Sequence, residues 1–283
     1  MNAGAFLGCP MWSLKSWIGP FLPTGTKQRD FLREYSRRLN CVEGNTTFYA
    51  LPDVATVERW RDETPEDFRF CFKVPQRISH ELKLINAEQE TAALIDRLQH
   101  LGMRRGPTFL QLPPSFDAHM LPALRIFLER WPREFSLAVE PRHADFFGPA
   151  EAEFEDLLHT HTAARGIFDT TPLFALSPSY SPDVRQAQAA KPRFPLRRSR
   201  TAPFTFVRFC GQPDRAATHP WLVDWAAYIV KRLAAGEDCY FFLHTPDDAA
   251  APQLARDFHD LLTPHISLPP LPDFGNPQQS LFG

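Results

Sequence analysis

The sequence has no long hydrophobic run, and this absence excludes one class of protein. No stretch of about 18 apolar residues occurs among the 283 residues, so we expect no transmembrane helix. Residues 1–9 also lack the basic segment and the long apolar core of a secretory signal. The sequence therefore predicts a cytoplasmic protein that does not enter a membrane.

Cysteine is scarce, and its spacing does not predict a disulfide framework. The five cysteines are odd in number, and none forms a Cys-x-x-Cys pair. Four of them fall within apolar segments, where a free thiol behaves as a small buried hydrophobe. We therefore expect reduced, buried thiols, as is usual in the cytoplasm.

Several catalytic motifs are also missing. The chain has no Gly-x-Gly-x-x-Gly, no Walker-type phosphate loop and no Gly-x-Ser-x-Gly elbow. The sequence therefore gives no support to a dinucleotide-binding, nucleotide-loop or serine-hydrolase function. The formal net charge is only −2, so the protein as a whole is not built electrostatically for nucleic acid, although a local basic patch is compatible with it.

What the chain does have is a repeated alternation of short apolar segments and stretches with helical spacing. Within 221–233, for example, Trp221, Trp225, Ile229 and Leu233 recur at every fourth residue. The apolar segments are 6–11, 40–49, 68–74, 108–112, 136–139, 165–168, 204–209 and 239–243. Eight strand–helix units predict a single (β/α)8 TIM-type barrel, an α/β fold, over residues 1–263. A proline-rich, extended C-terminal tail follows over residues 264–283.

Polar side chains stand at the carboxyl ends of these segments, where the active sites of such barrels lie. Glu43 and Asn45 are two residues apart, so both side chains point to one face of a strand. We expect the catalytic residues and the substrate-binding residues to come from this set. The catalytic candidates are Glu43, Lys73, Glu140 and Asp169, and the substrate-binding candidates are Asn45, His80, Gln111, Arg142, Arg208 and His244.

This mixed charge has several uses that the sequence leaves open. The carboxylates serve general acid–base catalysis if their neighbours separate their pKa values. They hold a divalent metal if Glu43, Glu140 and Asp169 converge with His80 or His244, although the sequence requires no cofactor. The arginines clamp a phosphate or carboxylate, or the charges form buried ion pairs that close the strand ends. We expect an enzyme acting on a small anionic or phosphorylated substrate, with hydrolase, lyase and isomerase chemistry all open.

The connection over residues 170–203 is long and rich in proline. Its part 185–200 contains six basic residues and no acidic one. Loops of this length are usually functional or disordered. The two readings are an anion-binding lid over the strand ends and a solvated insertion whose charges only aid solubility.

The chain closes on a short peptide pattern. Residues 278–282 read Gln-Gln-Ser-Leu-Phe, which resembles the peptide by which many bacterial replication and repair proteins dock on the sliding clamp. Two apolar side chains on an extended tether suit burial in a partner's pocket. The partner-binding residues would be Gln278, Leu281 and Phe282; the alternative is a tail that folds back on the barrel. A clamp-tethered DNA-maintenance or nuclease-like factor is therefore a second hypothesis, and a non-catalytic ligand-binding barrel is a third.

A series of ordered motifs resembles one known family. The resemblance spans residues 8 to about 262, and its segments include 42–52, 72–80, 110–114, 138–143 and 207–209. These resemble the YecE-like proteins, domain of unknown function family 72. The resemblance implies a (β/α)8 barrel in a bacterial cytoplasmic protein and implies no reaction. Two departures lie on the expected site face: Cys210-Gly211, where relatives often have His-Gly, and His244-Thr245, where many have paired Asn.

Overall fold

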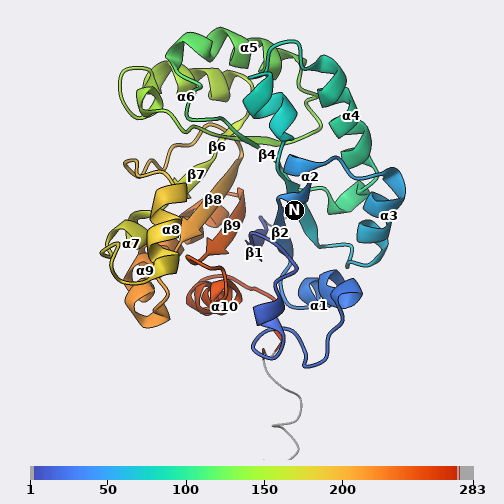
Figure 1. The fold of residues 1–283 in the computed structure, drawn as a ribbon, viewed down its shortest axis with the longest axis vertical. Helices are drawn as coiled ribbons and strands as arrows, with labels where there is room; N and C mark the ends of the chain where they lie inside the picture. Colours follow the sequence, from blue (N-terminus) through green and yellow to red (C-terminus); the bar gives the residue numbers. More distant parts are fainter. Residues whose placement is uncertain (1–2, 273, 275–283) are drawn as a thin grey trace, which may run out of the picture.

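The computed structural model describes residues 3–272 and 274, which form an α/β fold with strands inside and helices outside (Figure 1). One parallel sheet has six strands in the order β3-β2-β1-β9-β8-β7, and a second has three in the order β4-β5-β6. The strands are β1 (Ala5–Cys9), β2 (Cys41–Gly44), β3 (Arg69–Phe72), β4 (Thr108–Gln111), β5 (Leu137–Glu140), β6 (Ala164–Arg165), β7 (Ile167–Asp169), β8 (Phe204–Cys210) and β9 (Asp238–His244).

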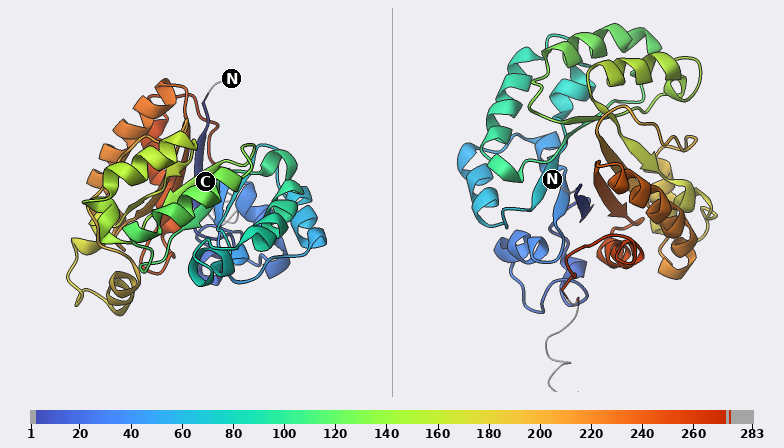
Figure 2. Two further views of the ribbon diagram at one scale, coloured as in Figure 1. Left: turned by 90° about the horizontal axis from the view of Figure 1, so that it is seen from above. Right: turned by 180° about the vertical axis from the view of Figure 1, so that it is seen from behind.

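Helices supply the crossover connections that parallel strands need. Both views of Figure 2 show them on the outer side of the strands. They are α1 (Phe31–Ser36), α2 (Thr46–Tyr49), α3 (Val54–Asp62), α4 (Glu88–Gln99), α5 (Leu121–Arg130), α6 (Glu151–Thr160), α7 (Thr171–Phe174), α8 (Pro182–Ala190), α9 (Arg215–Ala234) and α10 (Ala251–Leu262). No helix within the described residues is long and apolar enough to cross a membrane.

Each predicted apolar segment contains strand residues, so the α/β alternation is confirmed. The segment 40–49 is the clearest overestimate, because the strand stops at Gly44 and residues 46–49 form α2. The predicted strand 165–168 is two short strands, β6 and β7, separated at Gly166. A Cβ on Gly166 would lie 3.2 Å from the Cβ of Glu140, so glycine lets this strand approach β5 closely.

Hydrogen bonds connect the two sheets at β3 and β4. The Val74 amide donates to the Phe109 carbonyl at 2.8 Å, and the Gly106 amide donates to the Phe70 carbonyl at 2.9 Å. On the other side, β6 leads directly into β7 through Gly166. The strand ends of both sheets are therefore held next to one another.

The inward faces of the strands form an apolar layer below the strand ends. Phe206 stacks on Phe109 with ring centroids 5.4 Å apart and contacts Phe242 at 5.0 Å. Cys41 and Cys71 belong to the same buried cluster. All five cysteines are buried and unpaired, as expected for small apolar side chains. Polar groups above this layer are consequently screened from bulk water on one side.

The segment after α10 is extended but packed, which differs from the expected free tail. Residues 264–272 contain no helix or strand, yet Ile266, Leu268 and Leu271 contact the main core. Phe274 packs on Phe21 with ring centroids 4.8 Å apart. Apolar residues between the prolines explain this docking, because they bury surface without requiring regular structure. The clamp-binding candidates Gln278, Leu281 and Phe282 lie outside the described residues.

Candidate functional site

The centre of the strand-end face is a buried guanidinium between two carboxylates. Arg208 on β8 donates from Nε and Nη2 to both carboxylate oxygens of Glu43 on β2, at 2.8 and 2.9 Å. Its Nη1 donates to Oε2 of Glu140 on β5 at 3.1 Å. Glu43 is 0% and Glu140 1% exposed. Each nitrogen of Arg208 therefore already has a carboxylate partner, which fixes the side chain in place.

A chain of polar groups continues from Glu140 toward β3. Arg142 donates from Nε to Oε1 of Glu140. Gln111 on β4 donates from Nε2 to the same carboxylate at 3.0 Å and accepts from Lys73 Nζ at 2.8 Å. Gln111 thus places the Lys73 ammonium beside the Arg142–Glu140 pair without giving it a carboxylate of its own.

On the other side of the network, the Glu43 carboxylate has two further partners, Asn45 and His244. Asn45 donates to Glu43 Oε1 at 2.9 Å, and His244 Nε2 lies 3.1 Å from Glu43 Oε2. The other ring nitrogen of His244 is 3.8 Å from Asp248 Oδ1. The expected side chains at the ends of β2, β5, β8 and β9 therefore meet in one network.

This network keeps both glutamates ionised. Burial by itself disfavours the charged form of Glu43, but Arg208 and His244 outweigh it and hold the pKa of the carboxyl well below its usual value. Burial acts in the same way on Glu140, and Arg142 with Arg208 outweighs it, so this pKa is lowered too. Neither carboxyl is therefore suited to hold and release a proton near neutral pH.

For Lys73, the effect of burial outweighs the attraction of the nearby glutamates. Burial, reinforced by the charge of Arg208, lowers the pKa of the Lys73 ammonium to about 8. Its Nζ also lies 3.7 Å from the centre of the Phe48 ring, a cation–π contact. The Phe48 ring also makes a T-shaped contact with the His80 ring, with centroids 5.1 Å apart. An ammonium with this pKa exchanges protons close to physiological pH, which is what general acid–base work requires.

A cavity of about 490 Å³ lies above the network. Lys73, Gln111, Arg142, Arg208 and His244 reach its wall. Glu43 and Glu140 lie beneath it, fully buried. The terminal nitrogens of Arg142 have no hydrogen-bond partner among residues 3–272 and 274. The wall is consequently cationic on balance, because Glu43 and Glu140 lie below it, although Asp248 is an acid that lines it.

Two predicted site residues lie elsewhere. Asp169 accepts from the indole of Trp225 at 2.8 Å and from the Thr171 amide at 2.9 Å, so it faces the helices. Strand alternation explains this, because the preceding residue, Phe168, reaches the cavity. His80 lies on a short helical turn behind Phe48, and burial with the charges of Lys73 and Arg142 lowers its pKa to about 4.

The metal-binding alternative gains no support from this donor set. Glu43 and Glu140 are engaged by Arg208, and Asp169 is engaged by Trp225. In the part of the chain that the structure describes, His, Cys, Asp and Glu side chains do not assemble in groups of three or more that could hold a metal ion.

Several aromatic and charged residues of the cavity wall are not among the candidate site residues named from the sequence. Trp12 follows β1, Phe168 lies in β7, Lys191 follows α8, and Asp248 follows β9. Asp248 stands in the left-handed backbone region with φ 58°, held because its carboxylate accepts from the Thr245 amide at 3.1 Å and its carbonyl accepts from the Trp17 indole at 2.9 Å. Position after a strand was a signal for Trp12 and Asp248, and the basic segment 185–200, considered as an anion-binding lid, was a signal for Lys191.

The basic segment 185–200 is anchored by ion pairs rather than simply solvated, and its role as an anion-binding lid stays a prediction. Arg197 pairs with Glu151, Arg198 with Asp224, and Arg200 with Glu237. These pairs tie the segment to the neighbouring helices and to the start of β9. Of the described residues of this segment, Ala190 and Lys191 line the cavity, and Lys191 is the basic one.

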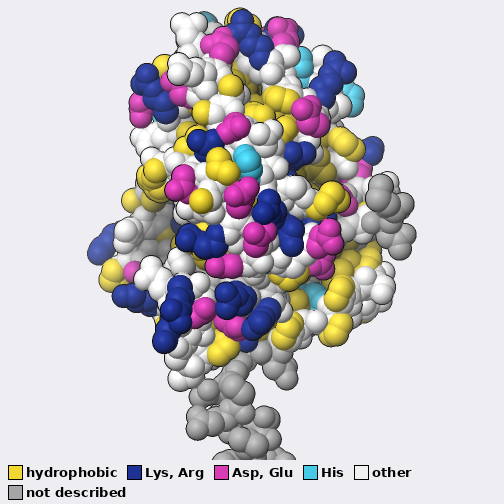
Figure 3. Space-filling model, turned by 90° about the vertical axis from the view of Figure 1, so that its right-hand side faces the viewer, with side chains coloured by type: hydrophobic (Ala, Val, Ile, Leu, Met, Phe, Trp, Pro, Cys, Tyr) yellow, Lys and Arg dark blue, Asp and Glu magenta, His cyan; other side chains and the backbone are white. Residues whose placement is uncertain are grey.

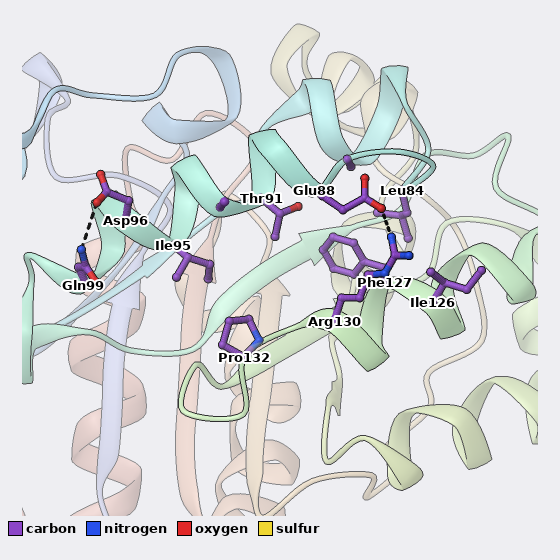
Figure 4. A pocket seen from close by; sticks show the side chains of 12 residues that line it. Leu84, Glu88, Thr91, Ile95, Asp96, Gln99, Ile126, Phe127, Arg130 and Pro132 are labelled. Atoms are coloured by element: carbon purple, nitrogen blue, oxygen red, sulfur yellow. Dashed lines mark hydrogen bonds and ion pairs between the residues drawn. The ribbon is translucent and has the colours of Figure 1, made fainter.

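A second hollow of about 550 Å³ lies between α4 and α5 (Figure 4). Ile95, Ile126 and Phe127 line it, and the Glu88–Arg130 ion pair stands at one end. It lies on the outer helices, away from the polar network. The face shown in Figure 3 mixes Lys and Arg with Asp and Glu side chains. The polar cavity at the strand ends is therefore the candidate functional site.

Comparisons with known proteins cover nearly the whole chain. The family described as "Protein of unknown function DUF72" matches residues 6–276. The chain is 37% identical to UPF0759 protein YecE of Escherichia coli K12 over 98% of this chain and 99% of that protein. A DUF72 family protein of Enterococcus faecalis V583 shares its fold with TM-score 0.69 and 19% identity, covering 95% of this chain and 98% of the other. One from Thermotoga maritima MSB8 gives TM-score 0.68 and 22% identity, covering 92% and 99%.

Proposed function

Since the chain belongs to the DUF72 family, a family of proteins of unknown function, we propose its activity from the site alone: an enzyme acting on a small anionic or phosphorylated substrate. The cationic wall of the strand-end cavity carries this proposal. Lys73 and Arg142 line the cavity, while Glu43 and Glu140 lie beneath it. A concave site with a few convergent polar groups is the usual form of a small-molecule site.

The residues of the network take different roles in this proposal. Arg142 binds the anion, and Lys73 transfers a proton or offsets negative charge that develops on the substrate. Glu43 and Glu140, first considered as acid–base groups, become positioning residues, because each is ion-paired and buried. Arg208 holds the two glutamates together and supplies positive charge from below. The reaction class is a matter for substrate screening.

Calorimetric titration with methylphosphonate tests the binding half of this proposal. We expect saturable binding to the protein, weakened about tenfold or more by Arg142→Gln, which corresponds to about 1.4 kcal/mol. Arg125→Gln is the control, because Arg125 is an exposed arginine on α5. Absence of binding, or equal binding by both variants, would contradict the proposal.

We also propose that the two sheets form one closed eight-unit barrel. The bonds Val74–Phe109 and Gly106–Phe70, together with the direct run of β6 into β7, support it. In a closed barrel the amides of Val74 and Gly106 are protected from hydrogen exchange as strongly as those of central strands. Rapid exchange at these two amides would argue for an open sheet.

A second proposal concerns residues 278–282. The sequence Gln-Gln-Ser-Leu-Phe supports docking on a bacterial sliding clamp, which would place the protein in DNA maintenance. Titration of clamp with the protein and with a Leu281→Ala/Phe282→Ala variant tests it. We expect saturable binding that the double variant loses; equal titrations would reject the clamp as a partner.

A further inference from the structure

We infer that the substrate of the strand-end cavity carries two separate anionic groups, the second of which binds Lys191. This inference rests on the proposed function, in which Lys73 and Arg142 receive the first group. It goes beyond that function by assigning a second binding subsite and a two-ended substrate.

Two cations of the cavity wall, Lys73 and Lys191, follow opposite edge strands of one sheet. Lys73 follows β3, and Lys191 stands in the connection after β7. These are the two outer strands of the six-stranded sheet, with β2, β1, β9 and β8 between them. Both side chains nevertheless line the same cavity. Two ammonium groups so placed face different parts of a bound molecule.

Among the described residues, Lys191 shares the lack of an acidic partner with Arg185 and Arg193, but it is the one of these three that lines the cavity. Arg197, Arg198 and Arg200 each form an ion pair with a carboxylate. For Lys191, the described residues place no carboxylate within 4.0 Å of the ammonium. Asp248 also lines the cavity. Burial raises its pKa and so disfavours its charged form, although the positive charge of Lys191 acts in the opposite direction. A charge left unpaired at a cavity wall is available to a ligand.

The backbone around Lys191 is fixed by hydrogen bonds. The Thr170 hydroxyl donates to the Pro192 carbonyl at 2.8 Å, and the Lys191 amide donates to the Ala187 carbonyl at 2.9 Å. Gln188 donates from Nε2 to the carbonyls of both Leu173 and Leu176. α8 is thereby bound to α7, so Lys191 does not depend on closure of a lid to reach the cavity.

The balance of charge also favours more than one anionic group. The cavity is lined by four cationic side chains, Lys73, Arg142, Lys191 and Arg208. The two buried glutamates offset two of them, and burial raises the pKa of Asp248 on the same wall and so disfavours its negative charge. The remaining excess is divided between the Lys73–Arg142 corner and Lys191. Apolar rings of Trp12 and Phe168 also line the wall, as suits a carbon framework that joins two anionic ends.

A series of alkane bisphosphonates, from ethane to hexane, tests this inference against methylphosphonate. We expect at least one spacer length to bind about tenfold tighter than methylphosphonate, or about 1.4 kcal/mol. Lys191→Met should abolish this advantage, and Lys191→Arg should keep part of it. Arg185→Met is the matched control, because Arg185 is an exposed cation of the same segment.

The outcomes separate the inference from the proposed function. If methylphosphonate binds but no bisphosphonate gains affinity, the second subsite is rejected and the proposed function stands. If the advantage survives in a folded Lys191→Met protein, Lys191 is not the second site. If no phosphonate binds, the proposed function fails and this inference fails with it.

Discussion

Arg208 is a buried charge whose partners decide what the site can do. Removing a guanidinium and two carboxylates from water is costly, and their mutual attraction compensates for this only with good geometry. Here Arg208 meets Glu43 through two hydrogen bonds and Glu140 through another. Such a set adds little net stability, but it fixes the cavity floor, and losing one partner leaves a charge uncompensated.

The first prediction follows from the difference between the small net stability of the complete ion-pair set and the large cost of losing one partner. Glu43→Gln should lower the free energy of unfolding by about 3–5 kcal/mol, because it leaves Arg208 with one carboxylate in a buried place. The double variant Glu43→Gln/Arg208→Met should recover part of the loss. Urea denaturation measures both. A loss below about 1 kcal/mol for the single variant would mean that the pair is not buried as described.

The second prediction concerns acid pH. Both glutamates have a folded-state pKa below their ordinary value of 4.5. Their stabilising contribution is therefore complete above pH 4.5 and is lost as pH falls through the lower folded-state values. The midpoint urea concentration should decrease in this range. The decrease should be smaller in the Glu43→Gln/Arg208→Met variant, and an equal decrease would contradict this assignment.

Strand alternation explains which site residues the sequence could predict. Glu43 and Asn45 were placed on one face by their spacing, and they do share one hydrogen bond. Asp169 was selected for its position at a strand end, but Phe168 occupies the inward face and turns the aspartate toward Trp225. In strands of only two and three residues on either side of a glycine, the sequence does not reveal which side chains point inward.

At the scale of elements, the sequence at the start of α8 contains a helix-start signal that the prediction of a long loop overlooked. Ser181 accepts from the Val184 amide at 3.1 Å, and Pro182 is the first residue of the helix. Ser-Pro is a helix-start signal, yet proline and charge made the whole of 170–203 resemble a loop. The ion pairs of Arg197 and Arg198 with distant acids could not be predicted, because they depend on the positions of α6 and α9.

The third prediction tests the attachment of α8. Gln188→Leu removes the donors to the Leu173 and Leu176 carbonyls, so residues 182–191 should exchange amide hydrogens about tenfold faster. Gln186→Leu is the control, since Gln186 is exposed on the same helix. Equal exchange in the two variants would show that these bonds do not hold the helix.

At the scale of the whole molecule, the repeated strand–helix pattern was the most reliable signal. It predicted the α/β fold because local periodicity determines which residues can be buried. The family resemblance is confirmed over residues 6–276. Which strands pair across the two sheets depends on contacts such as Gly106–Phe70, which lie far apart in sequence. The cationic cavity wall likewise emerges only when the ends of β3, β5 and β8 and the residue after α8 are assembled.

The central claim is that a desolvated Lys73 faces an anion-binding cavity, and a pH titration of isotope-labelled lysine by NMR tests it most directly. The Lys73 signal, assigned with Lys73→Arg, should titrate with a pKa of about 8. Methylphosphonate should raise that pKa, because a bound anion favours the charged ammonium. The exposed Lys231 on α9 serves as control. A Lys73 pKa at the ordinary 10.5, unmoved by methylphosphonate, would contradict the account.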